Sequence, residues 1–380
     1  MITAPFLPSS GQLLAVAHRN AYRAQLTHPS FGVVDLDLDP TLGHRLSVTF
    51  DEASAPRARA ELSGPLPSVA IDPRTGVRLG VSVGYQDAQA QLPEDVQELV
   101  DLVVRTASPT WSSPAPVLDL SASGDESLVI DASPAVAEST TGATHAAAIA
   151  ALLNKSLSPS PELVATVTGG AVTVDTIEDR WNGLSDLADG IGAQLYDDGL
   201  RTWHLDPTPD QVARTPHHAL TVGVGGTVIE PSRRQTRDEW HNYVRVRYRW
   251  RNAAGADQQV IGTSWVSSGP YAITGPAGRR ILTVDRDVAT TQARANLAAR
   301  SILTRTLSRG DVLELRAVAA YWLRPGMTVD VTLPTGQTLR HLVARVSFDV
   351  LAGTMTVATR WRRVWPVGRV TSTVMPGRSQ

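Results

Sequence analysis

The segment from residues 177 to 250 constrains the fold most, because three patterns follow one another there in a fixed order. An apolar stripe at helical spacing predicts an amphipathic helix, and its members are Ile177, Trp181, Leu184, Ala188 and Ile191. Next, the turn Asp197-Asp198-Gly199 lies between two apolar runs and predicts a β-hairpin, because Asp-Gly tolerates positive φ. Residues 242–251 then alternate strictly, which predicts a strand with valine and aromatic side chains on one face and arginines on the other.

Composition limits the class of protein. The chain has 380 residues, enough for two or three packed units, and its net charge of -2 argues against a dedicated nucleic-acid binder. It contains no cysteine, which excludes disulfides, thiolate metal sites and cysteine nucleophiles. The first ten residues lack the pattern of a signal peptide, and no apolar run approaches the ~18 residues of a membrane span. We expect a protein that is made in the cytoplasm, stays soluble and has no membrane span.

The order of local patterns predicts a mainly β chain with an α/β insert, that is, an α+β fold. Short alternating runs predict a first β-barrel-like domain over residues 1–130. Residues 131–211 predict a small α/β domain, with a helix over 144–154 and a hairpin around Gly169-Gly170. Residues 212–364 predict a second β-barrel-like domain with an inserted helix at about 287–309, and residues 365–380 form a C-terminal tail.

Residues that could carry catalysis or bind a metal do not form a convincing set. Asp35, Asp37 and Asp39 share one face of a strand and could bind a hard cation, but a solvated strand face is the better interpretation. The pair His217-His218 has no acidic residue at ligand spacing. No nucleophile elbow or phosphate-binding loop occurs in the sequence. We therefore predict no catalytic, cofactor-binding or metal-binding residues, and no enzymatic activity.

The row Arg245, Arg247, Arg249 and Arg251 is the one charge feature above background. Such a row could face nucleic-acid phosphates or the acidic surface of a protein partner. Acidic side chains on a neighbouring strand could instead balance it within the chain. We take these four residues as the candidate interface, with internal balance as the alternative.

Three local patterns together resemble the baseplate-hub family of tailed bacteriophages, also called tail-associated or minor tail proteins. The first is the predicted helix followed by residues 191–199 and Trp203-His204-Leu205-Asp206. The second runs from Arg233-Arg234 to the strand that begins at Asn242, and it is similar to the strand leading into the second barrel of that family. The third comprises Leu323-Arg324-Pro325-Gly326 and then residues 353–360. The beginning of the chain, Pro8-Ser9-Ser10 and Ala17-His18-Arg19, resembles minor tail proteins of actinobacterial siphoviruses.

This resemblance implies a homotrimer in which each subunit contributes two similar β-barrels. Six barrels would then adapt a sixfold tail tube to a threefold tip. The implied partners are a distal tail protein or tail-tube ring, the C-terminus of the tape-measure protein, other tail-tip or receptor-binding proteins, and DNA in transit. The implied location is the tail tip of a virion. Many members of the family continue into a peptidase, lysozyme or carbohydrate-binding module, whereas this sequence stops soon after the predicted second barrel.

Two other interpretations stay open at this point. One is the hub of a non-viral injection particle or a gene-transfer agent, which the sequence cannot separate from a phage hub. The other is a cell-wall glycan hydrolase or carbohydrate-binding protein, suggested by nine tryptophans in a β-rich chain. Most of these tryptophans, such as Trp181 and Trp250, fall on predicted core faces, which argues against an exposed platform for sugars.

Overall fold

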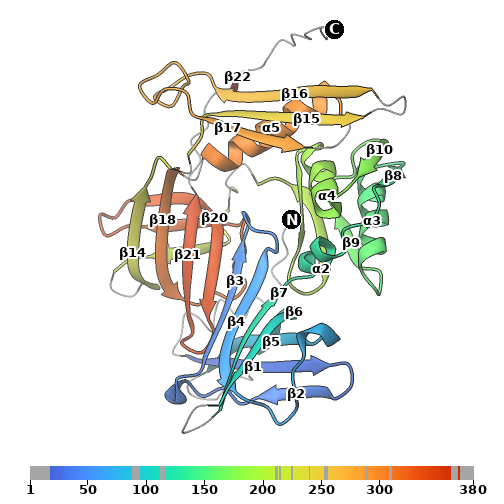
Figure 1. The fold of residues 1–380 in the computed structure, drawn as a ribbon. Coiled ribbons are helices and arrows are strands. Elements are labelled where there is room, and N and C mark those ends of the chain that lie inside the picture. Colours follow the sequence, from blue (N-terminus) through green and yellow to red (C-terminus); the bar gives the residue numbers. More distant parts are fainter. Residues whose placement is uncertain are drawn as a thin grey trace.

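A computed structural model describes residues 18–87, 95–111, 116–209, 213, 215–223, 226–238, 240–251, 256–286, 290–307, 310–360 and 367–368. Strands dominate this part of the chain and form sheets of 13, four, three and two strands (Figure 1). The prediction of a mainly β chain with helical insertions is therefore confirmed. Residues 1–17 and most of the C-terminal tail lie outside the described residues.

The first β unit begins the chain and contains seven strands. Its core-facing residues alternate along each strand, as in β3, where Leu46, Val48 and Phe50 are buried. The strands are β1 (His18–His28), β2 (Gly32–Leu36), β3 (Arg45–Asp51), β4 (Ala58–Pro65), β5 (Arg78–Asp87), β6 (Asp95–Thr110) and β7 (Val117–Ser123). The predicted alternation from Val77 to Val83 is confirmed in β5.

The second β unit is built from segments on both sides of an insertion. Its strands are β13 (His218–Thr221), β14 (Val228–Gln235), β18 (Asp311–Val318), β19 (Thr328–Thr332), β20 (Thr338–Asp349) and β21 (Thr354–Arg360). Residues Thr236 and Gly310 meet at the base of the insertion, where the N–H of Thr236 donates to the carbonyl of Gly310 at 3.0 Å. The chain therefore leaves and re-enters this unit at one point.

A single ladder joins the two β units. Strand β3 pairs antiparallel with β20, from Ser47 opposite Asp349 to Asp51 opposite Arg345. The 13-stranded sheet consequently runs through both units, and their buried side chains form one hydrophobic cluster (Figure 1). We expected two separate barrel-like domains. The strands of these two units instead share one open sheet, because the β3–β20 ladder carries the hydrogen bonding from one unit into the other, and the described strands form no closed barrel.

The α/β unit lies beside the first β unit and has its own core. It contains α2 (Glu126–Asp131), β8 (Glu138–Gly142), α3 (His145–Ser156), β9 (Glu162–Ala165), β10 (Val172–Ile177), α4 (Arg180–Asp189), β11 (Ala193–Asp197) and β12 (Thr202–Pro207). The helix predicted over 144–154 is α3, whose N-cap Thr144 accepts the N–H of Ala147. The helix predicted from the apolar stripe is α4, which starts three residues later than expected because Asp179 caps it.

The hairpin predicted around Gly169-Gly170 is wrong. Strand β9 pairs in parallel with β12, whereas β10 pairs with β8 in a different sheet. The turn between them is held against α3 instead, where His145 Nδ1 lies 2.8 Å from the carbonyl oxygen of Gly170. The Gly-Gly pair correctly predicts a turn, but residues far away in the sequence determine which strands β9 and β10 pair with.

The insertion in the second β unit forms a fourth packed layer. Strands β15 (Tyr243–Arg251), β16 (Asp257–Val266), β17 (Ile281–Arg286) and β22 (Val367–Gly368) make a four-stranded sheet, and α5 (Gln292–Leu307) covers one face of it (Figure 1). The inserted helix was predicted at about 287–309 and is confirmed as α5. The strand over 242–251 was assigned to the second barrel-like domain. It belongs to this separate sheet, because Val244, Val246 and Tyr248 pack against α5.

Candidate functional site

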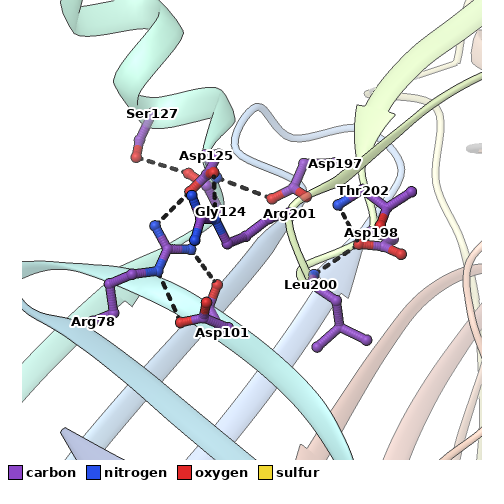
Figure 2. A network of polar contacts seen from close by, with 10 residues as sticks. All are labelled: Arg78, Asp101, Gly124, Asp125, Ser127, Asp197, Asp198, Leu200, Arg201 and Thr202. Carbon is purple, nitrogen blue, oxygen red and sulfur yellow. Dashed lines mark hydrogen bonds and ion pairs between the residues drawn. The ribbon is translucent and has the colours of Figure 1, made fainter. Parts of the chain in front are cut away.

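The predicted Asp-Gly turn lies against the first β unit. Strands β11 and β12 form the expected hairpin, and Asp198 Oδ1 accepts the N–H of Leu200 at 2.7 Å (Figure 2). Gly199 adopts φ 88°, and its carbonyl accepts the N–H of Asp101 on β6 at 2.7 Å. A Cβ at Gly199 would lie 3.3 Å or less from Val100 and from two further side chains of the first β unit. The turn is thus a contact between units.

A chain of charged groups continues from this turn. The Arg78 guanidinium on β5 contacts Asp101 Oδ1 at 2.8 Å and Asp125 Oδ1 at 2.9 Å (Figure 2). Asp125 directly precedes α2, and its backbone N–H donates to Asp197 Oδ2 at 3.0 Å. Arg201 approaches the other oxygen of Asp125 at 3.6 Å. Groups from β5, β6, β11, the residue that caps α2 and the turn before β12 therefore form one polar junction, which we call the Arg78 junction.

Two buried carboxyl groups lie behind the Arg78 junction. Glu126 accepts the backbone N–H groups of Arg57 and of Asp197, the latter at 3.2 Å. Burial raises the pKa of Glu126 to about 7, although both N–H donors favour its charged form. Burial also raises the pKa of Asp197 well above its usual range, and the nearby Glu126 adds to this effect. Asp197 Oδ1 has no hydrogen-bond partner in the part of the chain that the structure describes.

The Leu323-Arg324-Pro325-Gly326 pattern lies on the other side of the same region. The Arg324 guanidinium carbon lies 4.2 Å from the centroid of the Phe50 ring, and burial lowers the pKa of Arg324 to about 10. Arg57 Nη2 donates to the carbonyl of Pro325 at 2.9 Å, and its guanidinium lies over the ring of Tyr196 at 3.9 Å. Two of the patterns that carried the family resemblance therefore meet at one place in the fold.

A second set of ion pairs joins the α/β unit to the four-stranded sheet. Arg286 on β17 contacts Asp186 at 2.6 Å and Asp189 at 3.0 Å, both on α4. Arg305 on α5 contacts the other oxygen of Asp189 at 2.9 Å. Both aspartates are buried, and Arg286 pairs with each of them, so removing Arg286 would weaken the charge compensation of both carboxylates, whereas removing Arg305 would leave Asp189 paired with Arg286. Ion pairs therefore join the α/β unit both to the first β unit and to the four-stranded sheet with its helix α5.

The predicted arginine row lies on the face of the four-stranded sheet opposite α5. Arg247 forms a two-bond pair with Asp285 on β17, at 2.6 and 2.7 Å. Arg245 donates to Thr283 Oγ1 at 3.3 Å, and Arg249 is exposed. The side chain of Arg251 lies outside the described residues. The alternation along this strand is confirmed, and internal balance accounts for Arg247; the interface role of the row stays a prediction.

The other candidate ligands serve the structure. Asp35 accepts a hydrogen bond from Gln25 at 2.7 Å, and Asp39 caps a short 3-10 helix through the N–H of Thr41. His217 Nδ1 accepts the N–H of Thr328 at 3.1 Å. Among the described residues, no three His, Asp or Glu side chains lie together as metal ligands would. Sequence reasoning missed Arg57, Arg78 and Glu126, because each is an isolated charge without a periodic pattern around it.

Comparison with solved structures identifies the fold. The chain superposes on a tail protein from Neisseria meningitidis with a TM-score of 0.63 at 14% identity, covering 91% of this chain and 98% of that one. A 43 kDa prophage tail protein from Shewanella oneidensis gives 0.59 at 13% identity, with 90% and 98% covered. A prophage tail protein from Listeria monocytogenes gives 0.50 at 12% identity, with 89% and 94% covered. No protein-family model and no curated protein sequence matches the chain. The chain has the fold of these phage tail proteins.

The contact made by Gly199 predicts a specific loss of stability. Gly199→Ala places a Cβ in a left-handed residue and against the first β unit, so we expect a loss of about 2–4 kcal/mol in the free energy of unfolding. Gly192→Ala is the matched control, because Gly192 also has positive φ (70°), but a Cβ added there would have no atom within 4 Å. It should cost about 1 kcal/mol. Urea unfolding measures both, and equal losses would contradict the packing role of the turn.

The raised pKa of Glu126 predicts a pH-dependent stability. The folded state keeps a proton that the unfolded chain releases from about pH 4.5 upward, so this group's contribution falls as pH rises toward 7. Glu126→Gln removes the titration but loses one acceptor at every pH. We therefore expect the free energy of unfolding of the variant, measured relative to that of the natural chain, to rise by roughly 3 kcal/mol between pH 4.5 and pH 8.

Urea unfolding across this pH range measures that difference. The exposed Glu61→Gln is the matched control for removing a carboxylate. A difference between Glu126→Gln and the natural chain that stays constant with pH would show that Glu126 remains charged in its buried site.

Proposed function

We propose that this chain is a structural protein of the tail tip, a baseplate hub, in a siphophage-like particle. The observation that carries the proposal is the shared fold over about nine-tenths of the chain with tail proteins from three bacteria. In this role the chain has no catalytic activity. Its polar groups at the unit boundaries serve to fix the four packed layers against one another.

The arrangement of the β units suits a hub at a change of symmetry. A tube of sixfold rings can meet a threefold tip if each tip subunit presents two equivalent surfaces. The presence of two β units in each chain, joined in one sheet, supports this proposal. Three copies would then close a ring around a channel that DNA crosses at infection. We propose a homotrimer on this basis, with the ring below the tail tube.

The proposed neighbours follow from this position. A distal tail protein or the last tube ring would lie on one side of the ring, and receptor-binding or other tip proteins on the other. The C-terminus of the tape-measure protein would end in the channel. We assign the arginine row Arg245, Arg247, Arg249 and Arg251 to a protein contact in the particle. The exposed Arg249 supports this assignment, whereas Arg247 already pairs with Asp285 within the chain. In the part of the chain that the structure describes, no helix is long and apolar enough to span a bilayer.

The location in the particle tests this function directly. Particles are isolated from cells that carry the gene, so that a virion, a gene-transfer agent and other injection particles are all sampled. Gold-labelled antibodies against the purified chain should bind at the end of the tail distal to the capsid. A matched antibody against the tube protein should label the tail along its length. Label on the capsid, along the whole tube, or absent from every particle would contradict the proposal.

A further inference from the structure

The two β units repeat one arrangement of strands. In the first unit the order across the sheet is β3-β4-β7-β6-β5, and in the second it is β14-β18-β21-β20-β19. Numbered along the chain, both orders read first, second, fifth, fourth, third. Every pair of neighbours in both sets is antiparallel. Strand β14 therefore corresponds to β3, and β6 corresponds to β20.

The irregularities of the ladders align in the same way. The pairing of β6 with β7 shifts between Val104 and Thr106, and the pairing of β20 with β21 shifts between Val343 and Arg345. Both long strands also change partner next to the shift, since their first halves pair with β5 and β19. Aligning the two shifts places Ser108 in the position of Ser347.

The register carries this alignment across each sheet. Ser108 lies opposite Asp119 on β7, and the corresponding Ser347 lies opposite Thr356 on β21. Two strands further on, Ser232 pairs with Glu314 in the second unit as Ser47 pairs with Glu61 in the first. The positions match residue by residue, although the two units share little sequence.

One pair of matching edges, those of β3 and β20, is joined within the chain, whereas no described strand is joined along the other pair of matching edges, those of β14 and β6. Strand β3 pairs with the edge of β20 beyond Val343. The equivalent edge of β6 has no strand next to it among the described residues, because β5 stops pairing at Val103. Among the described strands, β14 is the last of its sheet; on its second edge only Val228 forms an isolated bridge, to Val222, and every residue of β14 after Val228 is exposed. Residues 105–110 of β6 are also exposed, apart from the half-buried Ala107.

We propose that β14 of one copy pairs antiparallel with residues 105–110 of β6 in the next copy, repeating the β3–β20 ladder between chains. This inference rests on the proposed ring of identical copies. The internal register predicts Arg234 opposite Ser108 and Ser232 opposite Thr110. The two strands lie at different ends of the chain's joined units, so the contact is head-to-tail and each copy supplies one strand to each neighbour.

The repeated ladder is weaker than the internal one. Val350 donates its N–H to Leu46 at 2.9 Å in the β3–β20 ladder, so by alternation the N–H of Phe348 also lies on the β3 side. Pro109 stands in the position of Phe348 and Pro231 in that of Leu46, and neither can donate. Prolines on free edges also block pairing with unrelated strands. The contact should therefore form in the assembled particle and not in dilute solution.

Disulfide cross-linking tests the register, because the natural chain has no cysteine. The double variant Ser108→Cys with Arg234→Cys is incorporated into particles, oxidised, and run on a non-reducing gel. The equivalent internal pair, Thr49 and Ser347, has its hydroxyl oxygens 2.8 Å apart, close enough for a disulfide after substitution. We expect cross-linked dimers and trimers.

Two control variants show how much cross-linking the expected register should give. Ser108→Cys with Gln235→Cys moves one cysteine to the opposite face of β14, and its cross-linked fraction should be roughly tenfold lower. Thr49→Cys with Ser347→Cys should form a disulfide within one chain and migrate as a monomer. Ser232→Cys with Thr110→Cys repeats the test at a second pair, should the substitution of Arg234 prevent assembly.

The outcomes separate this inference from the proposed function. Cross-linking at both expected pairs supports the β14–β6 contact. Equal cross-linking of the displaced pair, or none at either expected pair in particles whose copy number is three, overturns the contact and leaves the hub. Absence of the chain from the particles overturns both.

Discussion

Phe50 of β3 and Phe348 of β20 lie edge to face in the core, with ring centroids 6.4 Å apart, on the ladder that joins the two β units. The other contacts between units gather around this ladder. Gly199 lies against Phe50 from the side of the α/β unit, and Arg324 lies over the same ring from the second β unit. Glu52 continues the ladder and pairs with Arg360 at 2.6 Å. The relative placement of three layers thus depends on one strand pairing.

Charge adds to the apolar packing at the boundaries between units. Apolar packing and strand register set the placement along the ladder, and a buried carboxylate that lost its partner would in addition be left unsatisfied. Asp125, Asp186 and Asp189 are all buried and all paired with arginines from a different unit. In the proposed ring, such contacts would favour one arrangement of the units over its alternatives.

Local patterns in the sequence predicted the elements whose cause is local. The Asp-Gly turn, the stripe of α4 and the alternation of β15 were all readable, because each depends on residues close together in the chain. The β3–β20 ladder could not be predicted from the sequence, because Thr49 and Ser347 are separated by 298 positions and neither strand carries a local signal that identifies its partner. The same limit explains the wrong hairpin at Gly169-Gly170 and the placement of β15 in a separate sheet. Glu126 and Arg78 were missed because a single charge in a sequence does not reveal that it is buried.

The number and symmetry of copies at the tail tip test the central claim most directly. A reconstruction of the particle without imposed symmetry measures both. We predict three copies in one closed ring, with the two β units of each chain alternating around a channel at the end of the sixfold tube. Six copies in a ring, a single copy on the axis, or density for this chain in the capsid would contradict it.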